Sequence, residues 1–138
     1  ELPAGVVVAG DLYPGQGPLA GIHAGLSRCG REAAFCVACD MPYLEAAFIR
    51  RLARRFLRLG CDVLLPRFGG KIEPLHAVYR RSLLPRIEGL LADGQGNAIR
   101  RLLPAVRAAY LDMADTPATR RRFTNLNTPE DVRRVCEA

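Results

Sequence analysis

The sequence of 138 residues contains no tryptophan, two methionines and a single lysine, Lys71, and only 7% of its residues are aromatic. None of its apolar runs approaches the roughly 18 residues that are needed to cross a bilayer. Aromatic side chains that could stack on bases are few and no nucleic-acid-binding motif is present, which argues against a nucleic-acid-binding module. We therefore expect neither a nucleic acid nor a membrane as the partner of this chain.

The chain also lacks the features of a secreted protein. It begins with Glu1 rather than methionine, and no basic segment followed by an apolar stretch precedes the first predicted element. Its five cysteines are an odd number, which favours reduced thiols and a cytoplasmic location over a disulfide framework. Cys36 and Cys39 have a Cys-x-x-Cys spacing, but residues three apart on a strand point to opposite faces. We interpret them as small buried side chains rather than as zinc ligands or a redox pair.

The charge that is present is mostly positive and comes from arginine, with a formal net charge of +6. A basic protein of this kind suits a phosphorylated small molecule as ligand. The densest run, residues 120–122, is interpreted as a solvated turn, with a phosphate contact as the alternative. Five further arginines between positions 50 and 58 fall on one side of a predicted helix and are interpreted as its solvated face.

The order of predicted elements is strand, helix, strand, helix, strand in the first half of the chain. Short connections between such elements are typical of a parallel sheet with right-handed crossovers, hence of an α/β fold. Beyond Pro66 a hairpin and a returning strand are predicted, followed by mixed short elements. The expected elements are strands at 5–9, 33–39, 62–66, 75–79 and 108–111, an extended piece at 123–127, and helices from Pro18 to Gly30, 45–59, from Ser82 to about Gly94, 99–103, and from Thr128 onward.

Two carboxylates follow predicted strands, where ligands of open α/β sheets bind. Asp11 comes after the first strand and Asp40 directly after the second, ahead of Met41 and Pro42. Mg²⁺ prefers one or two carboxylates together with phosphate oxygens and water, so Asp40 is a candidate metal ligand. The alternative is that Asp40 only caps the turn at Pro42. The glycine-rich loop 15–21 before the first helix could hold an anionic group or a ribose, or could simply turn the chain.

Two histidines and two asparagines complete the candidates. His23 lies on the apolar side of the first helix and is interpreted as a hydrogen-bonded packing residue. His76 is left open, because it shares a hairpin with Lys71 and Glu73. Asn125 and Asn127 lie two positions apart in an extended piece and could contact a polar ligand or only support the turn before the last helix.

These residues carry a family resemblance. Asp11, the Gly-Pro-Leu-Ala-Gly run at 17–21, the Asp-Met-Pro run at 40–42, residues 73–79 and the Asn-x-Asn-Thr-Pro run at 125–129 resemble, in this order, the motifs of the molybdenum cofactor guanylyltransferases. The motifs cover almost the whole chain. The resemblance implies a single domain, residues 1–138, with a three-layer, mostly parallel α/β nucleotidyltransferase fold.

The resemblance also implies an activity: GMP would be transferred from GTP to molybdenum-bound molybdopterin, giving the guanine dinucleotide cofactor and pyrophosphate. Asp40 would be the catalytic Mg²⁺ ligand and Asp11 a second acidic contact to the nucleotide. Gly17, Pro18, Leu19 and Gly21 would lie against the nucleotide, and Asn125 and Asn127 toward the pterin. Proteins that deliver molybdopterin or receive the product are the partners this implies.

One element of the family pattern is not matched. The family begins with a strand, a Leu-Ala-Gly-Gly loop and a downstream Arg and Lys that hold the triphosphate, and no segment here corresponds to them. We therefore expect an N-terminally truncated chain that does not transfer nucleotide alone. A sister cytidylyltransferase that makes the cytosine dinucleotide and a non-catalytic module that binds molybdopterin or a partner protein stay open as alternatives. A sugar- or alcohol-phosphate nucleotidyltransferase fits the Asn-x-Asn-Thr-Pro ending less well.

Overall fold

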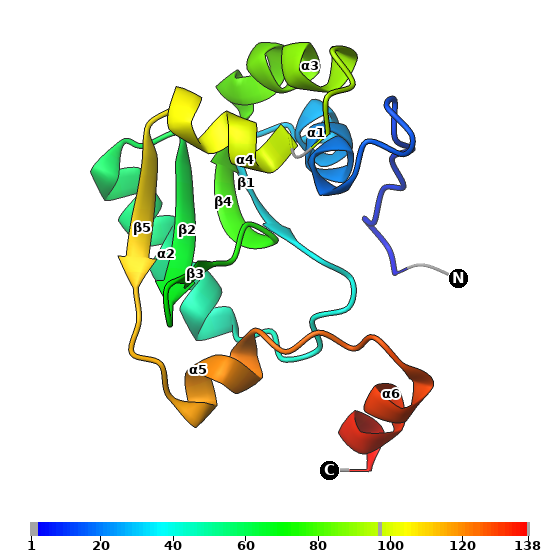
Figure 1. Cartoon of the computed structure of the whole chain (residues 1–138), viewed down its shortest axis with the longest axis vertical. Helices are drawn as coiled ribbons and strands as arrows, with labels where there is room; N and C mark the ends of the chain where they lie inside the picture. The colour runs from blue at the N-terminus through cyan, green and yellow to red at the C-terminus, as the bar shows by residue number, and fades with distance from the viewer. Residues whose placement is uncertain (1–2, 97, 138) are drawn as a thin grey trace.

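The computed structural model describes residues 3–96 and 98–137 and has the expected α/β architecture (Figure 1). A central sheet is covered by α1, α3 and α4 on one face and by α2 on the other. No helix in the described ranges is both long and apolar enough to cross a membrane. The elements are α1 (Pro18–Arg28), β1 (Ala33–Val37), α2 (Ala46–Leu59), β2 (Val63–Phe68), β3 (Lys71–Ile72), β4 (His76–Arg80), a 3₁₀ turn (Arg81–Leu83), α3 (Leu84–Ala92), α4 (Ala98–Leu102), a second 3₁₀ turn (Leu103–Ala105), β5 (Ala108–Asp112), α5 (Pro117–Arg122) and α6 (Pro129–Cys136).

The sheet is mixed, because a hairpin reverses the chain after β2. Gly69 and Gly70 have φ values of 52° and 75°, which suits glycine, and they return the chain through β3 into β4. Strand β4 therefore lies antiparallel between β1 and β2. Strand β5 pairs in parallel with β2 on the other side, so β1, β2 and β5 run in the same direction.

Alternating residues of the central strands separate two cores. Val63, Leu65 and Tyr79 face the core beneath α1, α3 and α4. Leu64 and Val78 face the second core, where Phe48, Leu52 and Phe56 of α2 are buried. The period of two along each strand thus places consecutive residues in different layers, which fixes the three-layer arrangement.

Several expected elements differ from the structure. Residues 5–9 are not a strand, and Val7 and Val8 are 72% and 74% exposed. A strand needs neighbouring backbone groups to pair with, and within the described ranges no strand lies beside this segment. β1, the first strand that forms, pairs with β4 along one edge only.

Three further expectations concern the second half of the chain. Ser82 lies inside the 3₁₀ turn Arg81–Leu83 and does not cap α3. Residues 124–127 pair with no strand of the sheet, and the run of arginines at 120–122 ends helix α5 instead of forming a turn. Thr128 caps α6 as expected, and it forms a capping box with Asp131.

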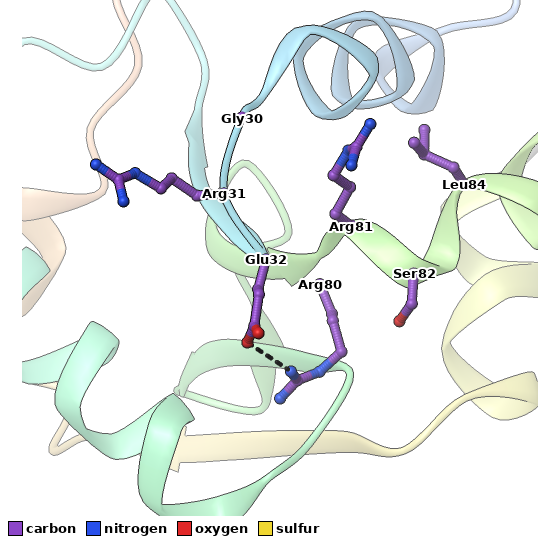
Figure 2. Close-up of a pocket in the computed structure, with 7 residues that line it drawn as sticks. All are labelled: Gly30, Arg31, Glu32, Arg80, Arg81, Ser82 and Leu84. Carbon is purple, nitrogen blue, oxygen red and sulfur yellow. Dashed lines mark ion pairs between the residues drawn. The ribbon is translucent and has the colours of Figure 1, made fainter.

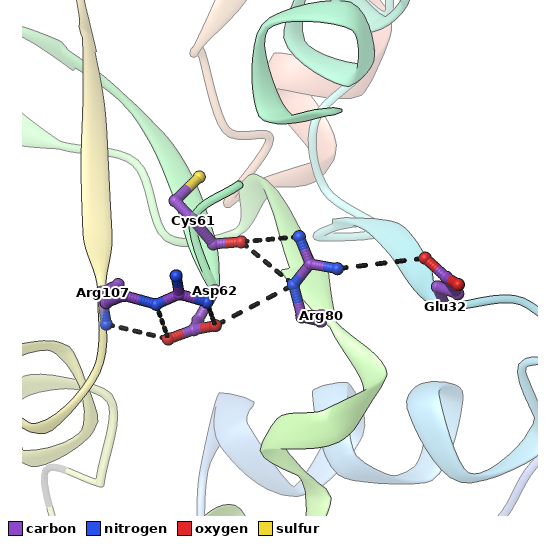
Figure 3. A network of polar contacts seen from close by, with 5 residues as sticks. All are labelled: Glu32, Cys61, Asp62, Arg80 and Arg107. Carbon is purple, nitrogen blue, oxygen red and sulfur yellow. Dashed lines mark hydrogen bonds and ion pairs between the residues drawn. The ribbon is translucent and has the colours of Figure 1, made fainter. Parts of the chain in front are cut away.

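The amino-terminal ends of β2 and β5 are joined by a network of polar contacts (Figure 3). The carboxylate of Asp62 accepts hydrogen bonds from the backbone amide of Arg107 at 3.0 Å and from its guanidinium at 2.9 and 3.2 Å. Arg80 donates two hydrogen bonds of 3.1 Å to the carbonyl of Cys61 and lies 3.9 Å from Asp62. The hydrogen bonds from Arg107 hold the pKa of Asp62 below its usual value. The network fastens three strands together at the end opposite Asp40.

We predict that Asp62→Ala lowers the free energy of unfolding by about 1–3 kcal/mol, because the amide and guanidinium of Arg107 lose their acceptor and Arg80, 23% exposed, loses its neighbouring carboxylate. Asp112→Ala is the matched control. It removes the exposed pair with Arg67, so the expected loss is at most about 1 kcal/mol. Urea unfolding at pH 7 measures both. The difference between the native chain and Asp62→Ala should be full above the ordinary carboxyl pKa and should shrink as the pH falls through the lowered pKa of Asp62. An equal loss in the two variants would contradict this assignment.

Candidate functional site

Asp40 lies at the edge of a cavity of about 620 Å³ between α1 and β1. One wall is formed by Pro18, Gly21 and Ile22 of α1, the other by β1 and Leu75. The residue is partly exposed, yet its Oδ1 atom is buried and has no hydrogen-bond partner among the described residues. A buried polar atom without a partner is costly unless a ligand satisfies it. A carboxylate oxygen in this state, beside an open cavity, has the chemistry of a ligand for a hard cation.

A second cavity of about 430 Å³ is built around the glycine-rich loop before α1. Gly15, Gly17, Pro18 and Leu19 line it on one side, and Pro74 with residues of the 96–100 segment on the other. Pro18 lines both cavities, so they adjoin at the start of α1. Gly17 has a φ of 74° and no described side chain caps the helix there. The loop therefore leaves the positive end of the α1 dipole open to a ligand.

Two backbone hydrogen bonds bring separate sequence motifs to Asp40. The amide of Ala38 donates to the carbonyl of Leu75 at 3.1 Å, which fastens the 73–79 motif beside the end of β1. The amide of Leu126 donates to the carbonyl of Asp40 at 2.8 Å. Residues 125–127 are thereby held against the strand end that carries Asp40, although neither segment is part of a sheet there.

Side chains of α5 strengthen this junction. Arg122, only 15% exposed, makes hydrogen bonds of 3.0 and 2.8 Å to the two carboxylate oxygens of Glu45 and lies 4.5 Å from the centre of the Phe48 ring. The hydrogen bonds from Arg122 lower the pKa of Glu45. Arg121 lies 4.5 Å over the ring of Tyr43. These contacts clamp the 40–45 loop to the segment that leads into Asn125.

The sequence did not reveal the role of Arg121 and Arg122, which were expected in a solvated turn. Their partners precede them by more than 70 positions, and a run of arginines carries no sign of so distant a carboxylate. The only local signal is that Arg122 directly precedes Phe123, whose ring is buried in the second core.

The other expected site residues differ in whether they line one of the two cavities. Asp11 is exposed and lines neither cavity. Leu19 is buried in the first core and reaches only the wall of the second cavity. Asn125 and Asn127 are exposed on either side of Leu126. The structure thus brings Pro18, Gly21 and Asp40 together in one cavity, with Gly17 and Leu19 in the adjoining one.

Neither histidine lies in these cavities. His23 is buried and shares a 3.0 Å hydrogen bond with Glu88, as expected of a packing residue. His76 is fully buried among the rings of Phe35, Phe48 and Phe123. Burial, assisted by the charge of Arg122, lowers the pKa of His76 to about 4, so it is neutral at pH 7. His76 therefore does not gather with Lys71 and Glu73 at a reactive surface.

Two arginines that could have contacted phosphates at Asp40 form other interactions. Arg67 pairs with Asp112 and lies over the ring of Tyr110. Arg80 pairs with Ala33 across the sheet, at the opposite end of β1 from Asp40. In the described part of the chain no three His, Cys, Asp or Glu side chains cluster as a metal site. A cation at Asp40 would therefore take its remaining ligands from phosphate and water, as Mg²⁺ does at nucleotide sites.

A larger cavity of about 710 Å³ lies at that opposite end, where β4 leads into α3. Arg31, Arg80 and Arg81 line it, but Figure 2 shows their guanidinium groups pointing in different directions. Arg80 is directed toward Glu32 at 4.0 Å. Arginines that diverge in this way cannot close around one anion, so the candidate site is the cavity at Asp40.

Comparisons with known proteins show which proteins the chain is similar to. The chain is 36% identical over 128 residues to a probable molybdenum cofactor guanylyltransferase of Carboxydothermus hydrogenoformans, covering 91% of this chain and 64% of that protein. It is 33% identical over 125 residues to a protein of the same description from Methanothermobacter thermautotrophicus, covering 89% and 63%. The chain thus spans less than two thirds of the length of these relatives.

Solved structures with a similar fold include a molybdopterin-guanine dinucleotide biosynthesis protein. Molybdopterin-guanine dinucleotide biosynthesis protein A from Archaeoglobus fulgidus superposes with a TM-score of 0.76 at 30% identity, over 92% of this chain and 66% of that one. A protein from Aquifex aeolicus, at 24% identity and a TM-score of 0.64, shares the fold. The model of the MobA-like NTP transferase domain matches residues 2–112. With its fold, its motifs and these relatives in agreement, the chain belongs to the MobA-like NTP transferase domain family.

Proposed function

We propose that this chain forms the metal-binding and acceptor-binding part of a molybdenum cofactor guanylyltransferase. In the proposed reaction GMP passes from GTP to the phosphate of molybdenum-bound molybdopterin, giving the guanine dinucleotide cofactor and pyrophosphate. The observation that carries the proposal is the buried Oδ1 atom of Asp40, which has no hydrogen-bond partner within residues 3–96 and 98–137, in a residue that lines an open cavity. The names of the relatives, molybdenum cofactor guanylyltransferases, support the choice of substrates.

The chemistry needs little acid–base assistance. A phosphate oxygen of molybdopterin attacks the α-phosphorus of GTP, a new P–O bond forms, and the bond to the β-phosphate breaks to release pyrophosphate. The attacking oxygen is already ionised at neutral pH, so no general base is required. The barrier lies in bringing two polyanions together in line, which is a task of positioning and charge stabilisation.

Each part of the site has a task in this scheme. Asp40 would hold Mg²⁺, which offsets the charge of the phosphates when it is bound. The hydrogen bond from Leu126 fixes the backbone of Asp40 and limits the directions its carboxylate can take. The loop with Gly17 and Pro18 would lie against the nucleotide, and the amides of Asn125 and Asn127 would donate to the acceptor.

Asp11 is proposed to contact the nucleotide from outside the two cavities. It is exposed and outside both cavities, so its proposed contact with the nucleotide would be made from the loop that precedes Gly17. The cytoplasm, with GTP and Mg²⁺ available, is the proposed location. Proteins that deliver molybdopterin or accept the product are the proposed partners.

We predict that Asp40→Asn, in a protein of the relatives' full length that carries this chain, lowers kcat/KM for GTP by at least about 100-fold. The substitution keeps the size of the side chain but removes its charge. Pyrophosphate release with GTP, Mg²⁺ and molybdopterin measures the loss of kcat/KM. The melting temperature should hardly change, because the Oδ1 atom loses no hydrogen bond to any described residue. Asp11→Asn is the comparison and should cost less. A variant at position 40 with near-native turnover would rule out the metal role.

Competition between the two nucleotides tests the choice of base in the same assay. We expect GTP to be consumed in preference to CTP, in keeping with the relatives. Preference for CTP would assign the reaction to a cytidylyltransferase. A full-length protein that consumed neither nucleotide would instead indicate a module that only binds molybdopterin or a partner protein.

We predict that Asn125→Ala and Asn127→Ala each raise the KM for molybdopterin by about fivefold to tenfold, since each removes one hydrogen-bonding side chain worth about 1 kcal/mol. The KM for GTP should stay within about twofold. Thr124→Val is the matched control, because the Thr124 hydroxyl donates to the carbonyl of Arg120 rather than to the site. A rise in the KM for GTP with an unchanged KM for molybdopterin would place the asparagines on the nucleotide side.

We predict that the 138-residue chain alone releases no pyrophosphate above background. Arg67 and Arg80 are engaged by Asp112, Asp62 and Glu32, so they are not free to grip a triphosphate at Asp40. The assay is the one used for the full-length protein, at equal molar concentration. Ready turnover by the isolated chain would contradict the prediction.

A further inference from the structure

The net positive charge of the chain is concentrated on one helix. The sequence has 20 basic and 14 acidic side chains. Helix α2 contributes five arginines and no carboxylate, so the rest of the chain holds 15 basic and 14 acidic residues, a net charge of only +1. The asymmetry is a property of the α2 face rather than of the whole surface. Its members are Arg50, Arg51, Arg54, Arg55 and Arg58.

These arginines form no ion pair within the described residues, a property they share with six others, no two of which lie on the same helix or strand. Across the described residues eight other arginines form ion pairs with Asp or Glu, whereas none of the five on α2 does. All five are exposed. They form two adjacent rows, with Arg50, Arg54 and Arg58 four positions apart in one and Arg51 and Arg55 in the other. The longer row extends over about 12 Å along the helix. The helix thus presents closely spaced guanidinium groups whose carboxylate partners are not supplied by the described chain.

We propose that this α2 face is a docking surface for an acidic surface of a partner protein. Guanidinium groups pair with carboxylates in a planar, bidentate geometry, and arginine is enriched in protein interfaces. Leu57 lies beside the rows and is 72% exposed, which offers the apolar contact that such interfaces also contain. The inference rests on charge and geometry alone and is independent of nucleotidyl transfer.

Other occupants fit this face less well. An anionic membrane binds amphipathic helices through their apolar side, but Phe48, Leu52 and Phe56 of α2 are buried in the second core. Single-stranded nucleic acid needs exposed aromatic rings, and no aromatic residue in the described ranges is among the exposed large apolar side chains. A small phosphate compound needs a concave site. The cavity of about 260 Å³ beside α2 is lined by Ala53, Phe56 and Leu57 of the helix but by none of its five arginines.

The position of α2 relates the docking surface to the candidate site. The helix begins at Ala46, six residues after Asp40, and the loop between them is clamped to α5 through Glu45 and Arg122. Figure 1 shows α2 on the face of the sheet opposite α1, α3 and α4. A partner bound along α2 would leave the cavity between α1 and β1 open, so docking and ligand binding can occur together.

The test uses a defined acidic probe. A fluorescent helical peptide of about 16 residues carries glutamates in two rows at four-residue spacing beside a leucine. Its binding to the 138-residue chain is measured by anisotropy at about 0.1 M salt, against a scrambled peptide of the same composition, a short duplex DNA and phosphatidylserine vesicles. The ordered peptide should bind most tightly. Equal binding of the scrambled peptide, or tighter binding of the DNA or the vesicles, would overturn the proposal.

Two variants with the same net charge distinguish binding through the α2 arginines from binding that depends only on the total charge of the protein. Both change four arginines to glutamine and reduce the formal charge from +6 to +2. The α2 variant should bind the ordered peptide about tenfold more weakly, as the loss of four exposed ion pairs implies, and the control less than about twofold more weakly. Equal weakening would show that only net charge matters and would overturn the proposal. The α2 variant changes Arg50, Arg51, Arg54 and Arg58, and the control changes Arg28, Arg31, Arg81 and Arg86.

Glutamine is nearly as good a helix former as arginine, so α2 should persist in the variant. Far-ultraviolet circular dichroism and thermal melting verify this. If the variant with four substitutions unfolds, the double variant Arg51→Gln and Arg55→Gln replaces it. Its affinity for the ordered peptide should be about threefold weaker. Unchanged binding of the ordered peptide to the folded double variant would also overturn the proposal.

Discussion

The hydrogen bond from the amide of Leu126 to the carbonyl of Asp40 is the contact on which the candidate site depends. It joins the end of β1 to a segment that comes after the last strand, so that the Asp-Met-Pro and Asn-x-Asn motifs become neighbours. The ion pair between Arg122 and Glu45 reinforces the junction from the side of α5. The Oδ1 atom of Asp40 itself has no hydrogen-bond partner among the described residues. A side chain that is held in place but not satisfied is what a metal-dependent transfer site requires.

The two ends of the sheet have different properties. At the amino-terminal ends of β2 and β5, Asp62 and Arg107 satisfy one another, and Arg80 is held by the carbonyl of Cys61. At the carboxyl end of β1, Asp40 lines an open cavity and the connections are irregular. In α/β sheets ligands bind beyond the carboxyl ends of the strands, and the network at the other end supplies the rigid support that such a site needs.

The arginines also differ in whether they pair with a carboxylate. Most carboxylates in the described chain are neutralised by nearby arginines, which stabilise helix ends and strand ends locally. Of the eleven arginines that form no ion pair within the described residues, five lie together on α2. This group of unpaired arginines lies on the helix that directly follows the Asp40 loop.

The sequence by itself determined the α/β class, most helix and strand positions and the set of motifs, because these follow from local periodicity, turn residues and capping. Helix α2, the hairpin at Gly69 and Gly70 and the cap at Thr128 lie where the pattern predicts them. Only the tertiary structure decided that residues 5–9 stay outside the sheet, that His76 is enclosed by three phenylalanine rings, and that Arg122 serves Glu45. The physical reason is that each of these outcomes depends on a partner, or on the absence of one among the described residues, at a long distance along the chain. Local propensity contains no information about such a partner.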